Sequence, residues 1–233
     1  MILVLCVAVP AAAQDSPLPW LDDSRRDAGL PTLAADGLLS ATAIRWAGLC
    51  AAAGVISHVG RDGSTALDRY RARGGTEMRV GEILGAGPTL ADVENAWMAS
   101  REHRSLVLGA DWTHVGWGRV ASRGSEVWVV LFTAKLVAGL EITGGDDGAR
   151  VTGRMLPEAR AVVLLDGSRE LAPSSWDPAT RSFVFLVSPG RGYFQLARRS
   201  DDGGLSVTNV FTLPRETGSP GGQDRFSGPG ASP

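Results

Sequence analysis

The sequence predicts an α+β protein, in which a layered helix–sheet–helix domain precedes a small all-β module. Apolar residues recur at helical spacing between residues 39 and 50, which indicates an amphipathic helix. Residues 126–133 form a near-continuous apolar run of strand length, as is typical of a strand that is covered on both faces. After Gly139 the chain changes to short β-like runs that are separated by turn residues, which favours a separate β module.

A first long helix is predicted between Asp36 and Gly54. Its apolar stripe consists of Leu39, Ala43, Trp46 and Cys50. Asp36 stands where an N-cap is expected, and Gly54 is a residue at which helices commonly end. Because Cys50 lies on the apolar stripe, we interpret it as a buried thiol rather than as a nucleophile.

A second helix and two strands complete the layered domain. The segment Thr89-Leu90-Ala91-Asp92 resembles a capping box, with Asp in place of the usual Glu, and predicts a helix through Trp97 and Met98. Residues 114–120 and 126–133 are predicted as antiparallel strands that are joined by a turn at residues 122–125. Helical stretches around such a buried sheet imply helices on both of its faces.

The second region, residues 139–213, reads as a β-sandwich-like module. Its predicted strands are residues 161–165, 182–187, 192–197 and 205–213. Asp166-Gly167 is a turn pair of the hairpin type. From residue 214 to residue 233 the chain is rich in Gly, Pro and Ser and has no core-forming pattern, so we expect a disordered tail.

The N-terminus resembles an export signal. Ile2–Val9 is an apolar run, and Ala11-Ala12-Ala13 before Gln14 offers a small-x-small site with cleavage after Ala13. Residues 1–13 are therefore predicted to be a signal peptide, and the protein to be secreted, extracellular or periplasmic. The alternative is an apolar N-terminus on a cytosolic protein. The run is too short to span a membrane, and cleavage would leave Cys50 as the only cysteine.

Composition and motifs exclude several functional classes. The formal net charge is −2 and no basic stripe is present, so the sequence argues against a nucleic-acid-binding surface. There is no G-x-S-x-G elbow, no P-loop and no dinucleotide glycine pattern. A serine hydrolase of that type, a nucleotide hydrolase and a dinucleotide-dependent enzyme are therefore not favoured.

Two of the three histidines and one glutamate are the candidate site. His58, Glu82 and His103 each lie in a short polar stop between apolar segments. If they converge, the imidazoles and the carboxylate suit a divalent ion such as zinc, or an acid/base pair with an oriented imidazole. They form no local ligand motif, so spacing alone does not show convergence. For His114, which opens a predicted strand, we expect a structural role.

The order of short motifs along the chain resembles bacterial members of the CAP superfamily, which includes cysteine-rich secretory, antigen 5 and pathogenesis-related 1 proteins. The matching segments, in order, are R-x-x-x-G-L-x-x-L within Asp23–Leu33, Ser57-His58 with Asp62-Gly63-Ser64, Arg69, Gly81-Glu82, W-M-x-S-x-x-H-R at residues 97–104, Val115-Gly116-Trp117-Gly118 and residues 128–132. The resemblance to this bacterial, SCP-like extracellular branch covers residues 17–137. It does not extend beyond Gly139.

The resemblance implies an α-β-α sandwich with a cleft that holds two histidines and two acidic residues. His58, Glu82 and His103 match three of these four positions. Ser100 stands where the family has its second acidic residue, and Ile83 stands where the family has an asparagine after the glutamate. Glu94 or Glu102 are the neighbouring carboxylates that could substitute.

Two functions from different classes follow for this cleft. The first is a binding module, in which His58 and His103, with Glu82, hold a divalent cation such as zinc or calcium. Its surface would then bind an envelope glycan, a lipid or a protein. The second is a metal-dependent peptidase or esterase, in which Glu82 acts as base or orients a histidine and His58 and His103 complete the catalytic set. A third possibility is that the β module alone does the binding.

Overall fold

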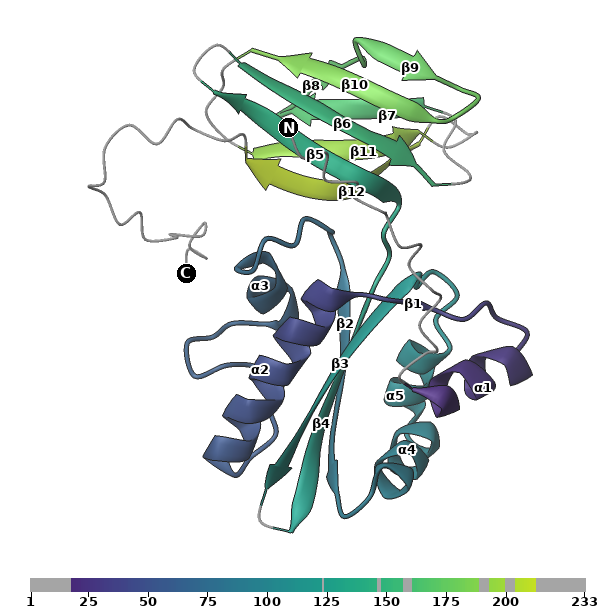
Figure 1. The fold of residues 1–233 in the computed structure, drawn as a ribbon, viewed down its shortest axis with the longest axis vertical. Helices are drawn as coiled ribbons and strands as arrows, with labels where there is room; N and C mark the ends of the chain where they lie inside the picture. The colour runs from purple at the N-terminus through teal and green to yellow at the C-terminus, as the bar shows by residue number, and fades with distance from the viewer. Residues whose placement is uncertain are drawn as a thin grey trace, which may run out of the picture. The chain divides into compact units, whose positions relative to one another are not determined.

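The computed structural model describes residues 18–122, 124–145, 148–156, 161–188, 193–199 and 204–212. These residues divide into two compact units (Figure 1). The first runs to Leu136 and includes Ser206–Val210, and the second comprises Val137–Leu205 and the residues from Phe211 onward. The predicted signal peptide, residues 1–13, and the predicted tail, residues 214–233, lie outside the described residues.

The first unit contains five helices and four strands among the residues described. They are α1 (Pro19–Asp27), β1 (Ala34–Ala35), α2 (Gly37–Ala53), α3 (Ala66–Arg71), β2 (Val80–Gly87), α4 (Leu90–Ala99), α5 (Arg101–Val107), β3 (His114–Ser122) and β4 (Ser125–Thr133). The sheet order is β1-β3-β4-β2, with β1 parallel to β3 and the other pairs antiparallel. The predicted α+β class and the layered arrangement are confirmed.

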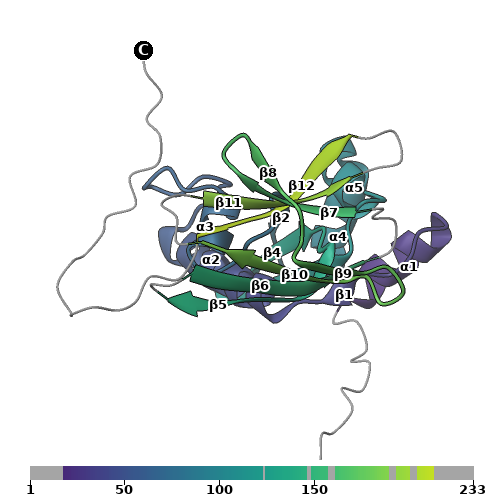
Figure 2. The same ribbon diagram turned by 90° about the horizontal axis from the view of Figure 1, so that it is seen from above.

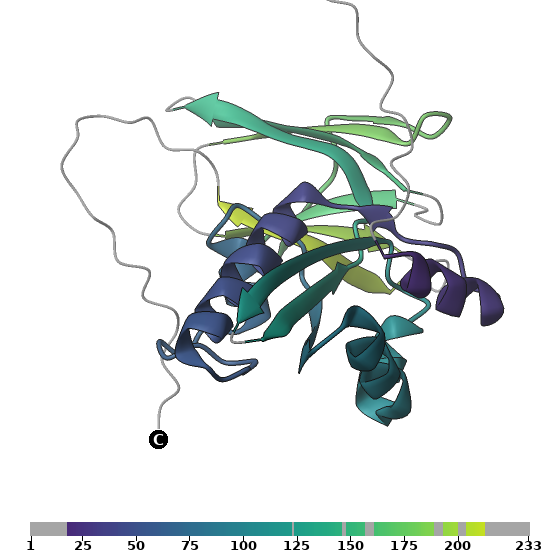
Figure 3. The same cartoon turned by 60° about the horizontal axis from the view of Figure 1, so that its bottom comes forward.

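Helices cover both faces of this sheet. On one side lie α2 and α3, and on the other lie α1, α4 and α5, as the ribbon shows in two orientations (Figure 1; Figure 3). Each face has its own apolar core, one centred on Trp97, Trp112 and Phe132 and the other on Trp46 and Tyr70. The central strand β4 is buried from Val127 to Thr133, which is why its sequence is almost continuously apolar.

The predicted ends of the long helix are confirmed. The Asp36 carboxylate accepts a hydrogen bond from the Leu39 backbone N–H at 2.7 Å, so it caps the N-terminus of α2. Gly54 ends the helix in the left-handed conformation, with φ of 69°. The stripe that includes Trp46 and Cys50 is buried against the sheet.

Glycines on β3 let α2 lie directly on the sheet. A Cβ at Gly116 would come within 2.3 Å of the Ser40 backbone N, and one at Gly118 within 2.2 Å of the Ile44 backbone N. Any side chain at these two positions would therefore push the helix backbone away. The G-x-G pattern of this strand is explained by packing.

Sequence reasoning predicted two strands in this unit and missed β1 and β2. β2 contains three glycines, Gly81, Gly85 and Gly87, and glycine is depleted in strands. The structure shows what these glycines allow, because a Cβ at Gly85 would come within 2.3 Å of the Val93 side chain on α4. Close helix packing thus replaces the side-chain pattern by which a strand is normally predicted.

The second unit is all-β in the described residues. Its strands are β5 (Val137–Gly145), β6 (Gly148–Met155), β7 (Ala161–Asp166), β8 (Arg169–Leu171), β9 (Ser175–Asp177), β10 (Ser182–Val187), β11 (Tyr193–Arg199) and β12 (Leu205–Thr212). They form two sheets, β5-β6-β10-β9 and β12-β11-β7-β8 (Figure 2). Phe183 and Phe185 from one sheet and Phe194 and Phe211 from the other belong to one apolar core. The predicted sandwich-like module is confirmed, although β5, β6, β8 and β9 were not predicted.

None of the helices in the described part of the chain has the length and apolar character that crossing a membrane requires.

Candidate functional site

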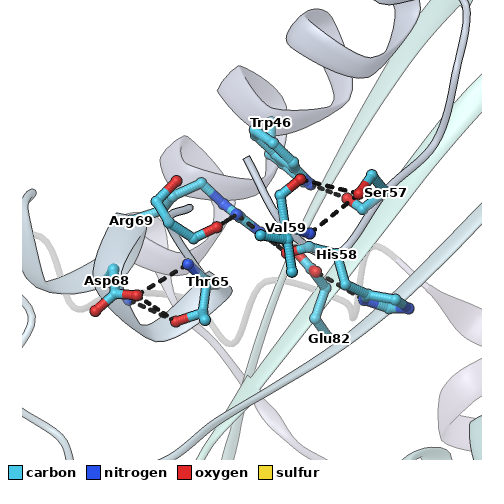
Figure 4. Close-up of polar contacts among 9 residues, drawn as sticks. Trp46, Ser57, His58, Val59, Thr65, Asp68, Arg69 and Glu82 are labelled. Atoms are coloured by element: carbon cyan, nitrogen blue, oxygen red, sulfur yellow. Dashed lines mark hydrogen bonds and ion pairs between the residues drawn. The ribbon is translucent and has the colours of Figure 1, made fainter. Parts of the chain in front are cut away.

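His58 lies in the loop between α2 and α3, and local hydrogen bonds fix this loop. The Trp46 indole on α2 donates to the Ser57 carbonyl at 3.0 Å. The Ser57 hydroxyl donates to the Val59 carbonyl at 2.9 Å and accepts from the Val59 N–H at 3.2 Å. These contacts hold the residues on both sides of His58 (Figure 4). The His58 side chain itself is 57% exposed.

The buried carboxylate of Glu82 on β2 accepts hydrogen bonds from two side chains. Its side chain is 5% exposed. Oε1 lies 2.9 Å from His58 Nδ1, and Oε2 lies 2.7 Å from Arg69 Nη2. An ionised carboxylate can only accept hydrogen bonds, so the His58 proton must lie on Nδ1. In the neutral imidazole, this contact leaves Nε2 as the nitrogen with a free lone pair.

Arg69 on α3 connects the loop to the strand. Its guanidinium donates to the Ser64 carbonyl at 2.8 Å and to the His58 carbonyl at 3.2 Å, in addition to the Glu82 carboxylate. The same group stacks 3.7 Å from the centre of the Trp46 ring. Arg69 thus compensates the buried charge of Glu82 and also positions the backbone of His58.

The capping box of α3 explains why Arg69 points at the loop. Thr65 accepts from the Asp68 N–H, and the Asp68 carboxylate accepts from the Thr65 N–H at 2.9 Å. Sequence reasoning matched Arg69 to a family position but gave it no role in the site. The sequence pattern that could have placed Arg69 is Thr65-x-x-Asp68, because it predicts the start of a helix that carries Arg69.

His103 lies in the first turn of α5, on the other side of the sheet from α2 and α3. Its backbone N–H donates to Ser100 Oγ at 3.4 Å. Burial lowers the pKa of His103, and the nearby His58 lowers it further, whereas Glu102 raises it. Among the described side chains, the structure pairs His58 with Glu82, and no hydrogen bond or ion pair joins the His103 side chain to either of them. In the part of the chain that the structure describes, no group of three or more His, Cys, Asp or Glu side chains could hold a metal ion as placed.

Comparison with protein families gives one match to this region. Residues 21–132 match the model of the CAP family, described as the cysteine-rich secretory protein family. Residues 21–132 form a CAP domain. Comparison with curated proteins gave no match.

Solved structures similar to this chain include two bacterial proteins. An outer surface protein from Borrelia burgdorferi has 26% identity and a TM-score of 0.47, over 49% of this chain and 86% of that chain. An extracellular protein containing an SCP domain from Bacillus anthracis has 23% identity and a TM-score of 0.45, over 49% of this chain and 38% of that chain. Venom allergen-like protein 4 from Schistosoma mansoni has 13% identity and a TM-score of 0.40, over 49% of this chain and 83% of that chain.

Two positions of the CAP domain depart from the pattern that the resemblance implied. Ser100 is the N-cap of α5, and its hydroxyl also donates to Glu102 Oε2 at 3.1 Å. Ile83 is fully buried in the core beneath α1, α4 and α5. Ser100 therefore starts a helix, and Ile83 packs in the apolar core. The break between α4 and α5 at Ser100 also places Glu102 in a new helix rather than on the face of α4.

The remaining residues considered from the sequence are buried or half-buried. Cys50 is a buried free thiol in the CAP domain. His114 Nδ1 lies 2.8 Å from the Thr113 hydroxyl at the start of β3. Burial lowers the pKa of His114, and the neighbouring Lys135 lowers it further. Burial also raises the pKa of Glu94 on α4.

Proposed function

We propose that the CAP domain is a binding module that acts outside the cytoplasm, and that His58 and His103 provide two ligands for a divalent cation. The observation that supports this is the His58–Glu82–Arg69 chain, which fixes the histidine tautomer and leaves Nε2 free. A carboxylate that accepts the other ring N–H of a metal-ligating histidine is the usual supporting contact at metal sites. In this proposal Glu82 orients His58 and does not itself bind the ion.

The contacts of Glu82 argue for this orienting role. Both carboxylate oxygens are paired, one with His58 and one with Arg69, and the side chain is almost fully buried. To act as a base or as a metal ligand, Glu82 would have to use a remaining lone pair from an almost fully buried position. A hydrolase that uses Glu82 as its base stays a prediction, and no contact among the described residues favours it.

The residues present fit zinc better than calcium. Imidazole nitrogen is a common zinc ligand, whereas calcium takes oxygen ligands, and the family's second carboxylate is replaced by Ser100. The lowered pKa of His103 favours the neutral imidazole, which is the form that binds metal. Two protein ligands leave the other coordination positions to water or to a bound molecule, so we expect weak binding. A bound zinc ion would supply a Lewis-acidic anchor for an oxygen of that molecule.

We propose that the bound partner is a molecule found outside the cytoplasm. The leader-like residues 1–13 and the secretory character of the matched family both support export. An envelope glycan, a lipid headgroup or a protein carboxylate could each complete the coordination of such an ion. The β unit is a second candidate for contact with the envelope.

Zinc titration followed by calorimetry tests the proposal. We expect the double variant His58→Ala/His103→Ala to weaken zinc binding at least tenfold, and Glu82→Gln to weaken it about 10- to 100-fold because the tautomer is no longer fixed. His114→Gln is the matched control, since it removes the third histidine without touching this pair. Equal zinc affinity in the double variant and the wild type would disprove the metal site.

A panel of peptides and esters completes the test. Turnover by the wild-type protein that disappears in Glu82→Gln, with unchanged circular dichroism, would replace the binding proposal by the hydrolase.

A further inference from the structure

A groove of about 820 Å³ lies beside the His58 loop, on the side of α2 and α3. Trp46, Ser57, Val59 and Arg69, which are among its lining residues, are drawn in Figure 4. The volume lies within the range of about 300–1,000 Å³ that is typical of small-molecule sites. The groove is separate from the proposed metal ligands, because neither His58 nor His103 lines it.

One wall of the groove is an apolar face of α2. Its lining residues from Arg45 to Ala53 recur at helical spacing, so they follow one face of the helix over about 12 Å. Leu49 on this face is 49% exposed. Val55 and Val59, in the loop that follows α2, are 63% and 52% exposed and line the same groove. Large apolar side chains that are exposed together along a concave surface mark a binding site more often than an ordinary surface.

The charges around the groove are mainly positive. Three arginines line it, Arg45, Arg61 and Arg69, and the only carboxylate that lines it is Asp62. Arg69 is already paired with Glu82. No carboxylate in the described part of the chain pairs with Arg45 or Arg61, which leaves two guanidinium groups for a ligand. Asp62 accepts a hydrogen bond from the Ser64 N–H at 3.0 Å, so its charge is directed to its own loop.

We propose that this groove binds a small organic monoanion with an apolar body. Its apolar part would cover Leu49, Val55 and Val59, and its anionic group would pair with Arg45 and Arg61. The planar guanidinium group matches a carboxylate with two parallel hydrogen bonds, which explains why arginines serve as the charged end of the site. The proposal does not rest on the metal site.

The experiment uses three probes of the same shape and different charge, which are para-hexylbenzoate, para-hexylbenzyl alcohol and para-hexylbenzylammonium. Calorimetry of the full chain should show binding of the anion, with the alcohol at least tenfold weaker and the cation without measurable binding. We expect Arg45→Gln/Arg61→Gln to weaken binding of para-hexylbenzoate at least tenfold, and Leu49→Ser to weaken it about tenfold. Arg73→Gln/Arg101→Gln is the matched control, because both arginines are exposed and lie outside the groove.

Three results would overturn the proposal. The first is equal binding of the anion and the alcohol, and the second is equal affinity in the two double-arginine variants. The third is a concentration-dependent dimer in analytical ultracentrifugation that Leu49→Ser dissociates, since a second copy of the chain would then cover this face. His58→Ala/His103→Ala should bind para-hexylbenzoate like the wild type, so failure of this proposal and failure of the zinc proposal are distinguishable.

Discussion

The two units of this chain bury different kinds of side chain. Among the described residues, seven of the nine buried polar and charged side chains lie in the helix–sheet part of the first unit, and they are Asp22, Arg25, Asp36, Thr42, Glu77, Glu82 and Thr133. The other two, Thr208 and Asn209, lie on β12. The core of the second unit consists of apolar residues such as Phe183, Phe185 and Phe194. A buried charge is costly unless it is paired, so a fold retains one only where it is well compensated. The first unit is therefore where specific polar chemistry is to be expected.

The largest expected effect comes from the apolar core of the second unit. Phe185→Ala removes a side chain that is 1% exposed, and we expect it to lower the free energy of unfolding by about 4 kcal/mol. Urea denaturation followed by circular dichroism measures the change. Phe185→Leu is the control and should cost less than about 1.5 kcal/mol. A loss below about 1 kcal/mol for Phe185→Ala would show that this core does not hold the unit together.

The corresponding test in the first unit removes the partner of a buried charge. Arg69→Gln leaves the Glu82 carboxylate without its cation, and we expect it to lower the free energy of unfolding by about 3 kcal/mol. The second change Glu82→Gln should restore part of this loss, because the uncompensated charge is then gone. Arg26→Gln breaks an exposed ion pair and should cost less than about 1 kcal/mol. Additive losses in the Arg69/Glu82 double variant would contradict the coupling.

How far the sequence predicts these features depends on how local they are. The N-termini of α2 and α4 were predictable because Asp36 and Thr89 cap them through backbone N–H groups three residues away. β4 was predictable because burial on both faces makes its sequence continuously apolar. β2 was missed because its glycines serve the packing of α4, which no pattern within the strand reveals.

The candidate site was predictable only in part. The contact between His58 and Glu82 joins residues that are 24 positions apart, so the spacing alone could not show it and the family resemblance carried it. The role of Arg69 escaped sequence reasoning, since it depends on the stacking with Trp46 and on two loop carbonyls. Such contacts are set by the tertiary fold, and only the requirement that a buried carboxylate needs a partner hinted at them.

Glycine-to-alanine substitutions in the two units are expected to have a smaller effect on stability, and the size of this effect should differ between the units. A Cβ at Gly118 on β3 would come within 2.2 Å of the backbone of α2, whereas one at Gly153 on β6 would meet the side chains of Phe183 and Val137 at 2.8 and 2.9 Å. We expect Gly118→Ala to lower the free energy of unfolding by about 2 kcal/mol and Gly153→Ala to lower it less, because side chains can shift more easily than a helix. Gly48→Ala, where no atom lies within 4 Å, should instead stabilise α2 by up to about 1 kcal/mol. Urea denaturation of the three variants ranks them, and equal losses for Gly118→Ala and Gly153→Ala would remove the distinction.

The smallest expected effect is the pH dependence of stability between about pH 7 and 5, and it belongs to the first unit because His58, His103 and His114 all lie there. Burial lowers the pKa values of both His103 and His114 in the folded state. Below the unfolded value of about 6.5 the unfolded chain therefore binds more protons than the folded chain, so the free energy of unfolding must fall as the pH is lowered. The fall ends once the pH is below the folded-state pKa values.

We expect His114→Gln to reduce the dependence of the free energy of unfolding on pH, as measured by urea denaturation at pH 7, 6 and 5. A slope that is identical in the wild type and in His114→Gln would mean that this half-buried histidine does not contribute to the difference between the units.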